Sequence, residues 1–141
     1  MADSAIHWSF IKKIPSTIEQ AADVVRKLVA QLEKLNWGVK DTFAIHMATE
    51  EAIMNAVKHG NARDASKFVE VELRLTENRF YAKIADQGKG FDPEQVPDPC
   101  DDSNLEKTSG RGVSLIKNFV EDVIYNESGN TIEFSKTRSE Q

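Results

Sequence analysis

Cysteine is nearly absent from this sequence, because Cys100 is the single one among 141 residues. A lone cysteine cannot form an intramolecular disulfide or a metal site built from several cysteines. The composition therefore gives no sign of an oxidising compartment, and a reducing cytoplasm is the simplest location for the protein.

Long hydrophobic runs and basic runs are also missing. No apolar stretch comes near the roughly 18 residues that a membrane-spanning helix needs. The first residues, MADSAIHW, lack the basic start and apolar run of a secretory signal. The net charge is −5, whereas nucleic-acid binding needs a basic footprint for the phosphates. We therefore expect neither a membrane nor a nucleic acid among the partners.

The length and the apolar periodicity predict one α+β domain over residues 1–141. The expected order is strand, helix, helix, strand, strand, long loop, helix, strand, strand. These elements are expected at residues 6–11, 16–36, 41–60, 68–76, 79–86, 87–111, 113–119, 122–126 and 131–136. Strands in hairpins, with helices able to pack on one face, predict a two-layer sandwich with a mostly antiparallel mixed sheet.

Four residues are expected to define helix ends. Ser16 and Glu19 have the spacing of a capping box, in which each side chain caps the other's backbone N–H. Asp41 is the expected N-cap of the second helix. Gly60 is suited to end that helix as a left-handed C-cap.

The second helix carries an unusual pair of polar residues, Glu51 and Asn55. They are four residues apart, so they lie on one face about a turn from each other. The same stripe carries Ala44, Ala48, Ala52 and His59, and the opposite stripe carries Phe43, Met47, Met54 and Val57. A helix that is small or apolar nearly all round is usually largely buried. The pair therefore suggests a lined cavity for a ligand; the alternative is a solvated helix edge.

Residues 87–111 differ from the rest of the chain because their periodicity is weak. They hold three of the four prolines and the acidic cluster Asp98, Asp101 and Asp102. Loops of this length inside a small domain are uncommon and are usually functional or disordered. Glycines at both ends, Gly88 and Gly90 before and Gly110 and Gly112 after, predict a mobile cover over a ligand.

Asp86 ends a predicted core strand and is followed by Gly88 and Gly90. The glycines let the backbone turn sharply and approach a ligand closely. A carboxylate at the base of a cavity can accept a hydrogen bond from an exocyclic amine such as adenine N6. The alternative is an ordinary Asp/Gly turn that closes a hairpin.

The segment Ser109-Gly-Arg-Gly precedes the third predicted helix. Backbone N–H groups at a helix start favour anions, and the guanidinium of Arg111 suits phosphate oxygens. The alternative is a pair of glycine hinges, Gly110 and Gly112. On the second helix, Asn55 offers a carbonyl oxygen suited to Mg²⁺, and Glu51 could orient or deprotonate a nucleophile that attacks a terminal phosphate.

Together these elements resemble the GHKL ATPase superfamily, which includes gyrase, the heat-shock chaperone, histidine kinases and MutL. Within it, the sequence is most similar to the anti-sigma serine/threonine kinases of the RsbW type. The resemblance extends over about residues 10 to 136. Its motifs are Glu51-Ala-Ile-Met-Asn55-Ala-Val-Lys-His59-Gly60, Asp86-Gln-Gly-Lys-Gly-Phe91 and Gly110-Arg-Gly-Val-Ser-Leu-Ile116.

The resemblance implies a Bergerat-type ATP-binding fold with an ATP lid at about 87–111. Asn55 would be the Mg²⁺ ligand, Glu51 the general base that activates a substrate serine, and Asp86 the adenine-binding residue. The glycines and the arginine would shape the rest of the site, Gly88 and Gly90 around the base and Gly110, Arg111 and Gly112 along the phosphates.

The implied function is that of an ATP-dependent serine/threonine kinase and anti-sigma factor. Its partners would be a sigma factor and a small antagonist protein, which it phosphorylates, and members of this branch commonly form homodimers. The sequence departs from the pattern in its long acidic lid and in Met54, where some members carry a small polar residue. Two alternatives stay open: an ATP-binding regulatory module without kinase activity, and a detached histidine-kinase ATPase domain.

Overall fold

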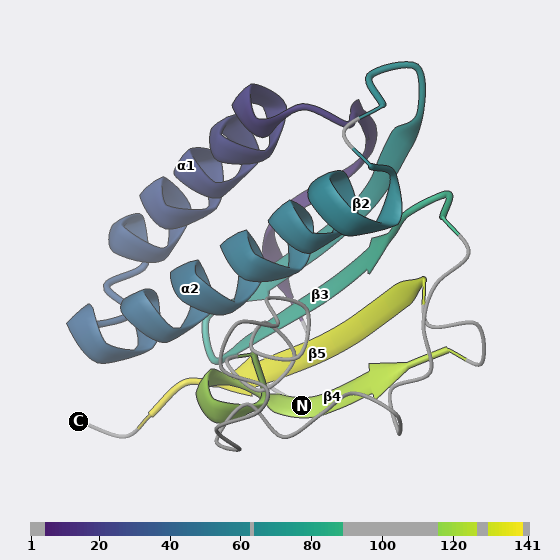
Figure 1. The fold of residues 1–141 in the computed structure, drawn as a ribbon. Helices are drawn as coiled ribbons and strands as arrows, with labels where there is room; N and C mark the ends of the chain where they lie inside the picture. Colours follow the sequence, from purple (N-terminus) through teal and green to yellow (C-terminus); the bar gives the residue numbers. More distant parts are fainter. Residues whose placement is uncertain (1–4, 63, 89–115, 127–129, 140–141) are drawn as a thin grey trace.

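A computed structural model of the chain describes residues 5–62, 64–88, 116–126 and 130–139 (Figure 1). Its described elements form one sheet of five strands with two long helices stacked over one face (Figure 1). In chain order they are β1 (Ile6–Pro15), α1 (Ile18–Lys34), α2 (Val39–Asn55), a π turn (Ala56–Gly60), β2 (Phe68–Thr76), β3 (Arg79–Ala85), β4 (Glu121–Tyr125) and β5 (Thr131–Thr137). Residues 116–119 are also helical, which agrees with the expected third helix; its start lies outside the described residues.

The strands lie in the order β1-β2-β3-β5-β4, and each of these four neighbouring pairs is antiparallel. The expected two-layer α+β sandwich is therefore confirmed, whereas the sheet expected to be mixed is antiparallel throughout its described strands. Strand β1 lies at one edge of this sheet. That strand is longer than expected: its pairing with β2 runs from Ile6 opposite Thr76 to Pro15 opposite Phe68. Proline at the last position has no N–H to donate, so it ends the strand.

The core lies between the helices and the sheet. Alternate residues of β2 point toward the helices, and Val69, Leu73 and Leu75 are fully buried there. Helix α1 contributes Leu28 and Leu32, which are equally inaccessible. Burying one such side chain stabilises the fold by about 1.5–3 kcal/mol, so the period-two pattern of β2 and the helical period of α1 together hold α1 on the sheet.

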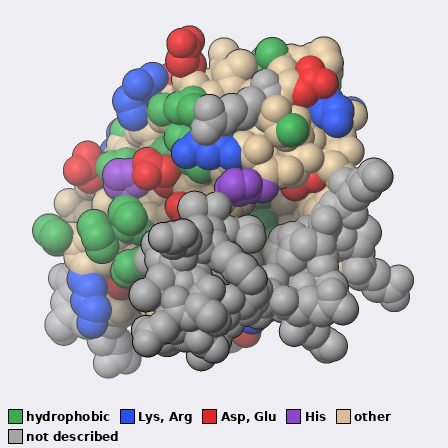
Figure 2. All heavy atoms as spheres, viewed as in Figure 1, with side chains coloured by type: hydrophobic (Ala, Val, Ile, Leu, Met, Phe, Trp, Pro, Cys, Tyr) green, Lys and Arg blue, Asp and Glu red, His purple; other side chains and the backbone are tan. Residues whose placement is uncertain are grey.

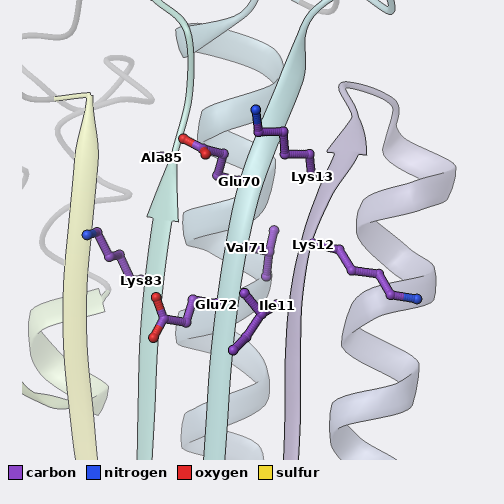
Figure 3. Close-up of a pocket in the computed structure, with 8 residues that line it drawn as sticks. All are labelled: Ile11, Lys12, Lys13, Glu70, Val71, Glu72, Lys83 and Ala85. Carbon is purple, nitrogen blue, oxygen red and sulfur yellow. The ribbon is translucent and has the colours of Figure 1, made fainter.

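The opposite face of the sheet is not covered by α1 or α2. In the close-up of Figure 3, the two helices run behind the strands, and charged side chains stand on the near side. Glu72 lies opposite Lys83 across β2 and β3, and Lys13 lies opposite Glu70 across β1 and β2. These side chains line a hollow on the sheet (Figure 3). Since the hollow lies on the far side of the sheet from α2, it is separate from the site predicted around that helix.

The predicted capping box at the start of α1 is wrong. The N-cap is Thr17, whose hydroxyl accepts the N–H of Gln20 at 3.2 Å. The Ser16 side chain points into the protein instead, and its hydroxyl donates to the carbonyl of Lys67 at 3.1 Å. The N-cap therefore lies one residue later than expected, because the Ser16 hydroxyl is hydrogen-bonded to Lys67 in the connection before β2.

The expected role of Asp41 as an N-cap is also wrong. Helix α2 begins at Val39, and its N-cap is Gly38, which has a φ of 81°. Asp41 lies one turn further in and is buried; its carboxylate accepts the N–H of Ser139 at 2.7 Å and the hydroxyl of Ser139 at 2.8 Å. The Asp41 carboxylate, which was expected to cap the helix, therefore accepts hydrogen bonds from Ser139, which follows the last strand β5.

Helix α2 is buried along one side only. Its alanine stripe, Ala44, Ala48 and Ala52, faces the core, but Phe43 is 54% exposed and contacts the ring of Phe119 edge-on at 5.9 Å. Hydrophobic side chains are visible at the surface near the start of α2 in Figure 2, close to acidic and histidine side chains. Among the described helices, none combines the length and the apolar character needed to cross a bilayer.

Candidate functional site

The π turn after α2 and the end of β3 come into close contact (Figure 1). A Cβ atom placed on Gly60 would lie 2.1 Å from both Cγ and Oδ2 of Asp86. Any larger residue at position 60 would therefore collide with the carboxyl group. The predicted strand-end aspartate and the end of the Glu51–Asn55 helix thus meet at one place in the fold.

The expected left-handed conformation of Gly60 is wrong. Among the described glycines, Gly38 has a positive φ and Gly60 does not; after the π turn it is Ala62 that takes a φ of 51°. Glycine at position 60 is needed for the close approach of Asp86, not for the backbone angle.

Gly88 is required by the same packing. A Cβ on Gly88 would lie 2.0 Å from the carbonyl oxygen of Gly60. The backbone N–H of Gly88 also donates to Oδ1 of Asp86 at 2.7 Å. The Asp-x-Gly sequence therefore folds back on itself, and its glycine lies against the end of the α2 segment.

The environment of Asp86 raises the pKa of its carboxyl group. Burial is the main cause; the hydrogen bond from Gly88 and the positive charge of Lys67 act in the opposite direction and are weaker. The backbone N–H of Asp86 donates to the carbonyl of Asn130 at 2.9 Å, which ties the end of β3 to the start of β5. A partly desolvated carboxylate held in this way is suited to accept a hydrogen bond from a ligand amine.

Glu51 and Asn55 both lie on α2 and are half-buried. Asn55 is the last residue of the helix, directly before the π turn that ends at Gly60. In the part of the chain that the structure describes, neither side chain has a hydrogen-bond partner. The neighbouring Glu50 differs, because it pairs with Nε2 of His46 at 3.3 Å. The predicted pair is thus accessible and unengaged within the described residues.

The described residues fit a nucleotide and its metal ion in their donor chemistry. They contain no group of three or more His, Cys, Asp or Glu side chains that could hold a metal by themselves. A cation at Asn55 would therefore rely on one amide oxygen together with water and ligand phosphates, which is how Mg²⁺ is commonly held. At the other end of the site, the two glycines let the Asp86 carboxyl group pack directly against the end of the α2 segment, where any side chain would collide.

Several predicted site residues cannot be placed. Gly90, Gly110, Arg111 and Gly112 lie outside the described residues, as does most of the expected lid at 87–111. For Gly88, which is described, the structure gives the contacts above.

Asn61 is not among the site residues predicted from the sequence. In the structure its side chain is fully buried and makes three hydrogen bonds to other segments. A local signal for this role is weak, because Asn is common after helices for conformational reasons alone. Two of the three partners, Ser16 and Gln87, lie 45 and 26 residues away in the sequence, and the third, Phe68, begins the next strand.

The fold and the site define a class: an α+β sandwich with an aspartate at the end of a core strand and a Glu/Asn pair on the helix above it. Residues 14–136 match the histidine kinase-like ATPase domain family. The chain belongs to this family.

Similar proteins agree with this assignment. The anti-sigma F factor of Bacillus subtilis is 28% identical over 127 residues, which is 86% of this chain and 87% of that protein. The serine-protein kinase RsbW of Staphylococcus aureus is 26% identical over 132 residues, which is 88% of this chain and 83% of that protein. A crystal structure of the RsbU and RsbW domains of a Mycobacterium tuberculosis protein matches 93% of this chain and 32% of that one, with a TM-score of 0.62 and 19% identity. The last similarity supports the fold.

Proposed function

We propose that this protein is an ATP-dependent serine/threonine kinase and anti-sigma factor, which phosphorylates a small antagonist protein and binds a sigma factor. The observation that carries the proposal is the glycine-bordered Asp86 carboxylate at the end of the segment that bears Glu51 and Asn55. The names of the relatives, an anti-sigma F factor and a serine-protein kinase, supply the substrate class. We also propose that the protein is located in a reducing cytoplasm and that it forms a homodimer.

The Asp86 carboxylate would accept a hydrogen bond from the exocyclic amine of adenine. Gly60 and Gly88 allow the close packing that holds this carboxylate at the end of the α2 segment. As the sequence predicts, Gly90 would lie beside the base, and Gly110, Arg111 and Gly112 would lie along the phosphates. This part of the site determines which nucleotide binds.

Asn55 would hold Mg²⁺ by its amide oxygen. The ion, when bound, supplies positive charge that neutralises the phosphate oxygens. Glu51, one turn earlier on the same side of α2, takes the proton of the substrate hydroxyl. The hydroxyl oxygen then forms a bond to the terminal phosphorus, and the bond from that phosphorus to the ADP oxygen breaks.

The first test is calorimetric titration of ATP into the wild type and into Asn55→Ala, each with and without Mg²⁺. We expect the wild type to bind and Asn55→Ala to lose the Mg²⁺-dependent part of the affinity, by roughly tenfold or more. A wild type that does not bind ATP contradicts the kinase proposal.

The second test is transfer of labelled phosphate to candidate antagonist proteins. We expect phosphate that resists acid, as phosphoserine and phosphothreonine do. Acid-labile, base-stable phosphate would favour the detached histidine-kinase domain instead. Tight binding of the partner proteins without any transfer would favour the ATP-binding regulatory module.

A further inference from the structure

The side chain of Asn61 is the most heavily bonded buried polar group near Asp86. Residue 61 is 0% exposed. Its amide nitrogen donates to Oγ of Ser16 at 2.6 Å and to the carbonyl of Phe68 at 2.9 Å, and its amide oxygen accepts the backbone N–H of Gln87 at 2.7 Å. Both N–H donors and the carbonyl of the amide are therefore engaged.

These bonds join four separate segments at one point. Ser16 follows β1, Phe68 begins β2, Gln87 follows β3 by two residues, and Asn61 itself follows the π turn of α2. The side chain of Gln87 closes the connection, since its Oε1 accepts the backbone N–H of Phe68 at 2.6 Å. The segment that bears Asp86 is thereby tied to the end of the α2 segment and to the neighbouring strand.

The backbone on both sides of Asp86 is held by hydrogen bonds. Its own N–H donates to the carbonyl of Asn130 at 2.9 Å, the next N–H, that of Gln87, donates to Asn61, and the one after, that of Gly88, donates to the Asp86 carboxylate. Of these three bonds, the one from Gln87 is made to a side chain of another segment. The backbone that directly follows Asp86 is thus held by the buried side chain of Asn61.

We propose that Asn61 is a positioning residue that sets the base selectivity of the Asp86 site, by holding the backbone of Gln87 so that the carboxylate faces the exocyclic amine of adenine. This inference rests on the proposed function, because it concerns the same nucleotide site. The inference goes beyond the proposed function in one respect. It states that the buried amide of Asn61, which lies outside the site, is needed to select adenine over a base that carries a carbonyl in place of the exocyclic amine. A residue that only stabilised the fold would change the folded fraction and leave this selectivity unchanged.

The experiment compares the affinities for ATP and ITP, which differ by the exocyclic amine that becomes a carbonyl in ITP. For the wild type we expect ATP to bind about tenfold or more tightly than ITP, because the carboxylate would be left facing a carbonyl. In Asn61→Ala, the ratio of the two affinities should fall to about threefold or less, with the loss mainly in ATP affinity. Calorimetry on protein shown to be folded by circular dichroism gives both constants.

Two matched variants separate positioning from stability. Asn61→Asp keeps an acceptor for the Gln87 N–H and loses the donors to Ser16 and Phe68, so it should be less stable and still prefer ATP. Ser16→Ala removes one buried partner of the same amide without touching Gln87, and it should also keep the wild-type ratio. If Asn61→Ala does not fold, Asn61→Ser takes its place, because its shorter side chain loses the same bond to Gln87.

The possible outcomes distinguish a failure of the inference about Asn61 from a failure of the proposed function. A wild type that binds no ATP contradicts the proposed function and is seen before any variant is made. A wild type that binds ATP and ITP equally well overturns the inference and leaves nucleotide binding in place. A folded Asn61→Ala, or Asn61→Ser in its place, that keeps the wild-type ratio also overturns it, and a collapsed ratio confined to these two variants supports it.

Discussion

The carboxyl group of Asp86 lies where the side chain of any residue other than glycine at position 60 would begin. The two residues are 26 positions apart, yet a Cβ on Gly60 would be 2.1 Å from Cγ of Asp86. This contact brings the end of the helix segment that carries Asn55 against the end of the strand that carries the aspartate. The proposed nucleotide site depends on it.

Gly60→Ala should therefore weaken both the fold and the site. We expect the free energy of unfolding to fall by about 1–3 kcal/mol, as for other overpacked sites, and ATP affinity to fall by roughly tenfold because Asp86 is displaced. Urea denaturation and calorimetry measure the two effects.

The control for this change is a double-mutant cycle with Asp86→Ala. Removing the carboxyl group removes the atoms that the new Cβ would meet, so Gly60→Ala should be clearly less destabilising in that background. Equal destabilisation in both backgrounds would show that the substitution acts elsewhere than on Asp86.

Asp86→Asn should separate stability from nucleotide binding. Burial raises the folded-state pKa of this carboxyl group, so its stabilising contribution is present below the unfolded pKa and is lost as the pH rises through the folded pKa. Above its folded-state pKa the ionised group is unfavourable for stability, and an amide that keeps the acceptor for Gly88 should there leave the free energy of unfolding equal or higher. ATP affinity should fall by about tenfold or more, because an NH₂ group then faces the amine of the base.

The pH dependence of ATP binding provides the control for Asp86. As the pH is lowered from above to below the raised folded-state pKa of Asp86, the wild type should lose affinity relative to Asp86→Asn, because the carboxyl group takes up a proton. The phosphates of ATP titrate equally in both titrations, so the difference reports Asp86. A variant that binds ATP like the wild type across this range would exclude Asp86 as the adenine-binding residue.

The contribution of Asp41 to the free energy of unfolding should depend on pH in the opposite direction to that of Asp86, and Asp41→Asn tests this. Burial acts to raise the pKa of Asp41, but the hydrogen bonds from Ser139 and the charge of Lys136, 3.6 Å away, outweigh it and lower the pKa overall. Its contribution is therefore present above the unfolded pKa and is lost as the pH falls through the folded pKa. We expect Asp41→Asn to reduce the free energy of unfolding by about 1–3 kcal/mol at neutral pH.

Denaturation at decreasing pH tests this expectation for Asp41. The gap between the wild type and Asp41→Asn should narrow as the pH falls below about 4, where the unfolded carboxyl group titrates. Ser139→Ala is the matched variant, since it removes the 2.8 Å hydroxyl bond and keeps the 2.7 Å backbone bond. A gap that does not change with pH would contradict an ionised Asp41 in the fold.

Glu51→Gln should abolish phosphotransfer while nucleotide binding continues. A general base contributes about 10²–10⁴-fold to the rate, so the single-turnover rate of transfer to the antagonist should fall by that amount with ATP affinity nearly unchanged. Glu50→Gln is the control, because Glu50 precedes Glu51 on the same helix but pairs with His46. Unchanged transfer in Glu51→Gln would end the proposed role of that residue.

Much of the fold and part of the site could be predicted from local patterns. The alternation in β2 depends only on which side chains prefer to be buried, and its apolar half, Val69, Val71, Leu73 and Leu75, is buried throughout. Asp86 was placed at the end of a strand by the same reasoning. Such patterns are visible in the sequence because strands and helices repeat within a few residues.

The parts that were missed depend on partners far along the chain. Ser16 and Asn61 are 45 residues apart, and Asp41 and Ser139 are 98 apart. A buried polar side chain takes whichever partner the packing brings within hydrogen-bond distance, and this overrides a local capping preference. For this reason Ser16 and Asp41 do not act as the helix caps that their residue types predicted.

The sequence by itself determined the α+β class, the order of the elements and the residues that could serve a nucleotide, because these follow from periodicity and side-chain chemistry. The tertiary structure alone decided that Gly60 lies against Asp86 and that Asn61 accepts the backbone N–H of the next residue, Gln87. Both relationships arise where the end of the α2 segment meets the end of β3. How closely these two backbones approach depends on how the segments pack together, so it cannot be derived from the sequence of either segment alone.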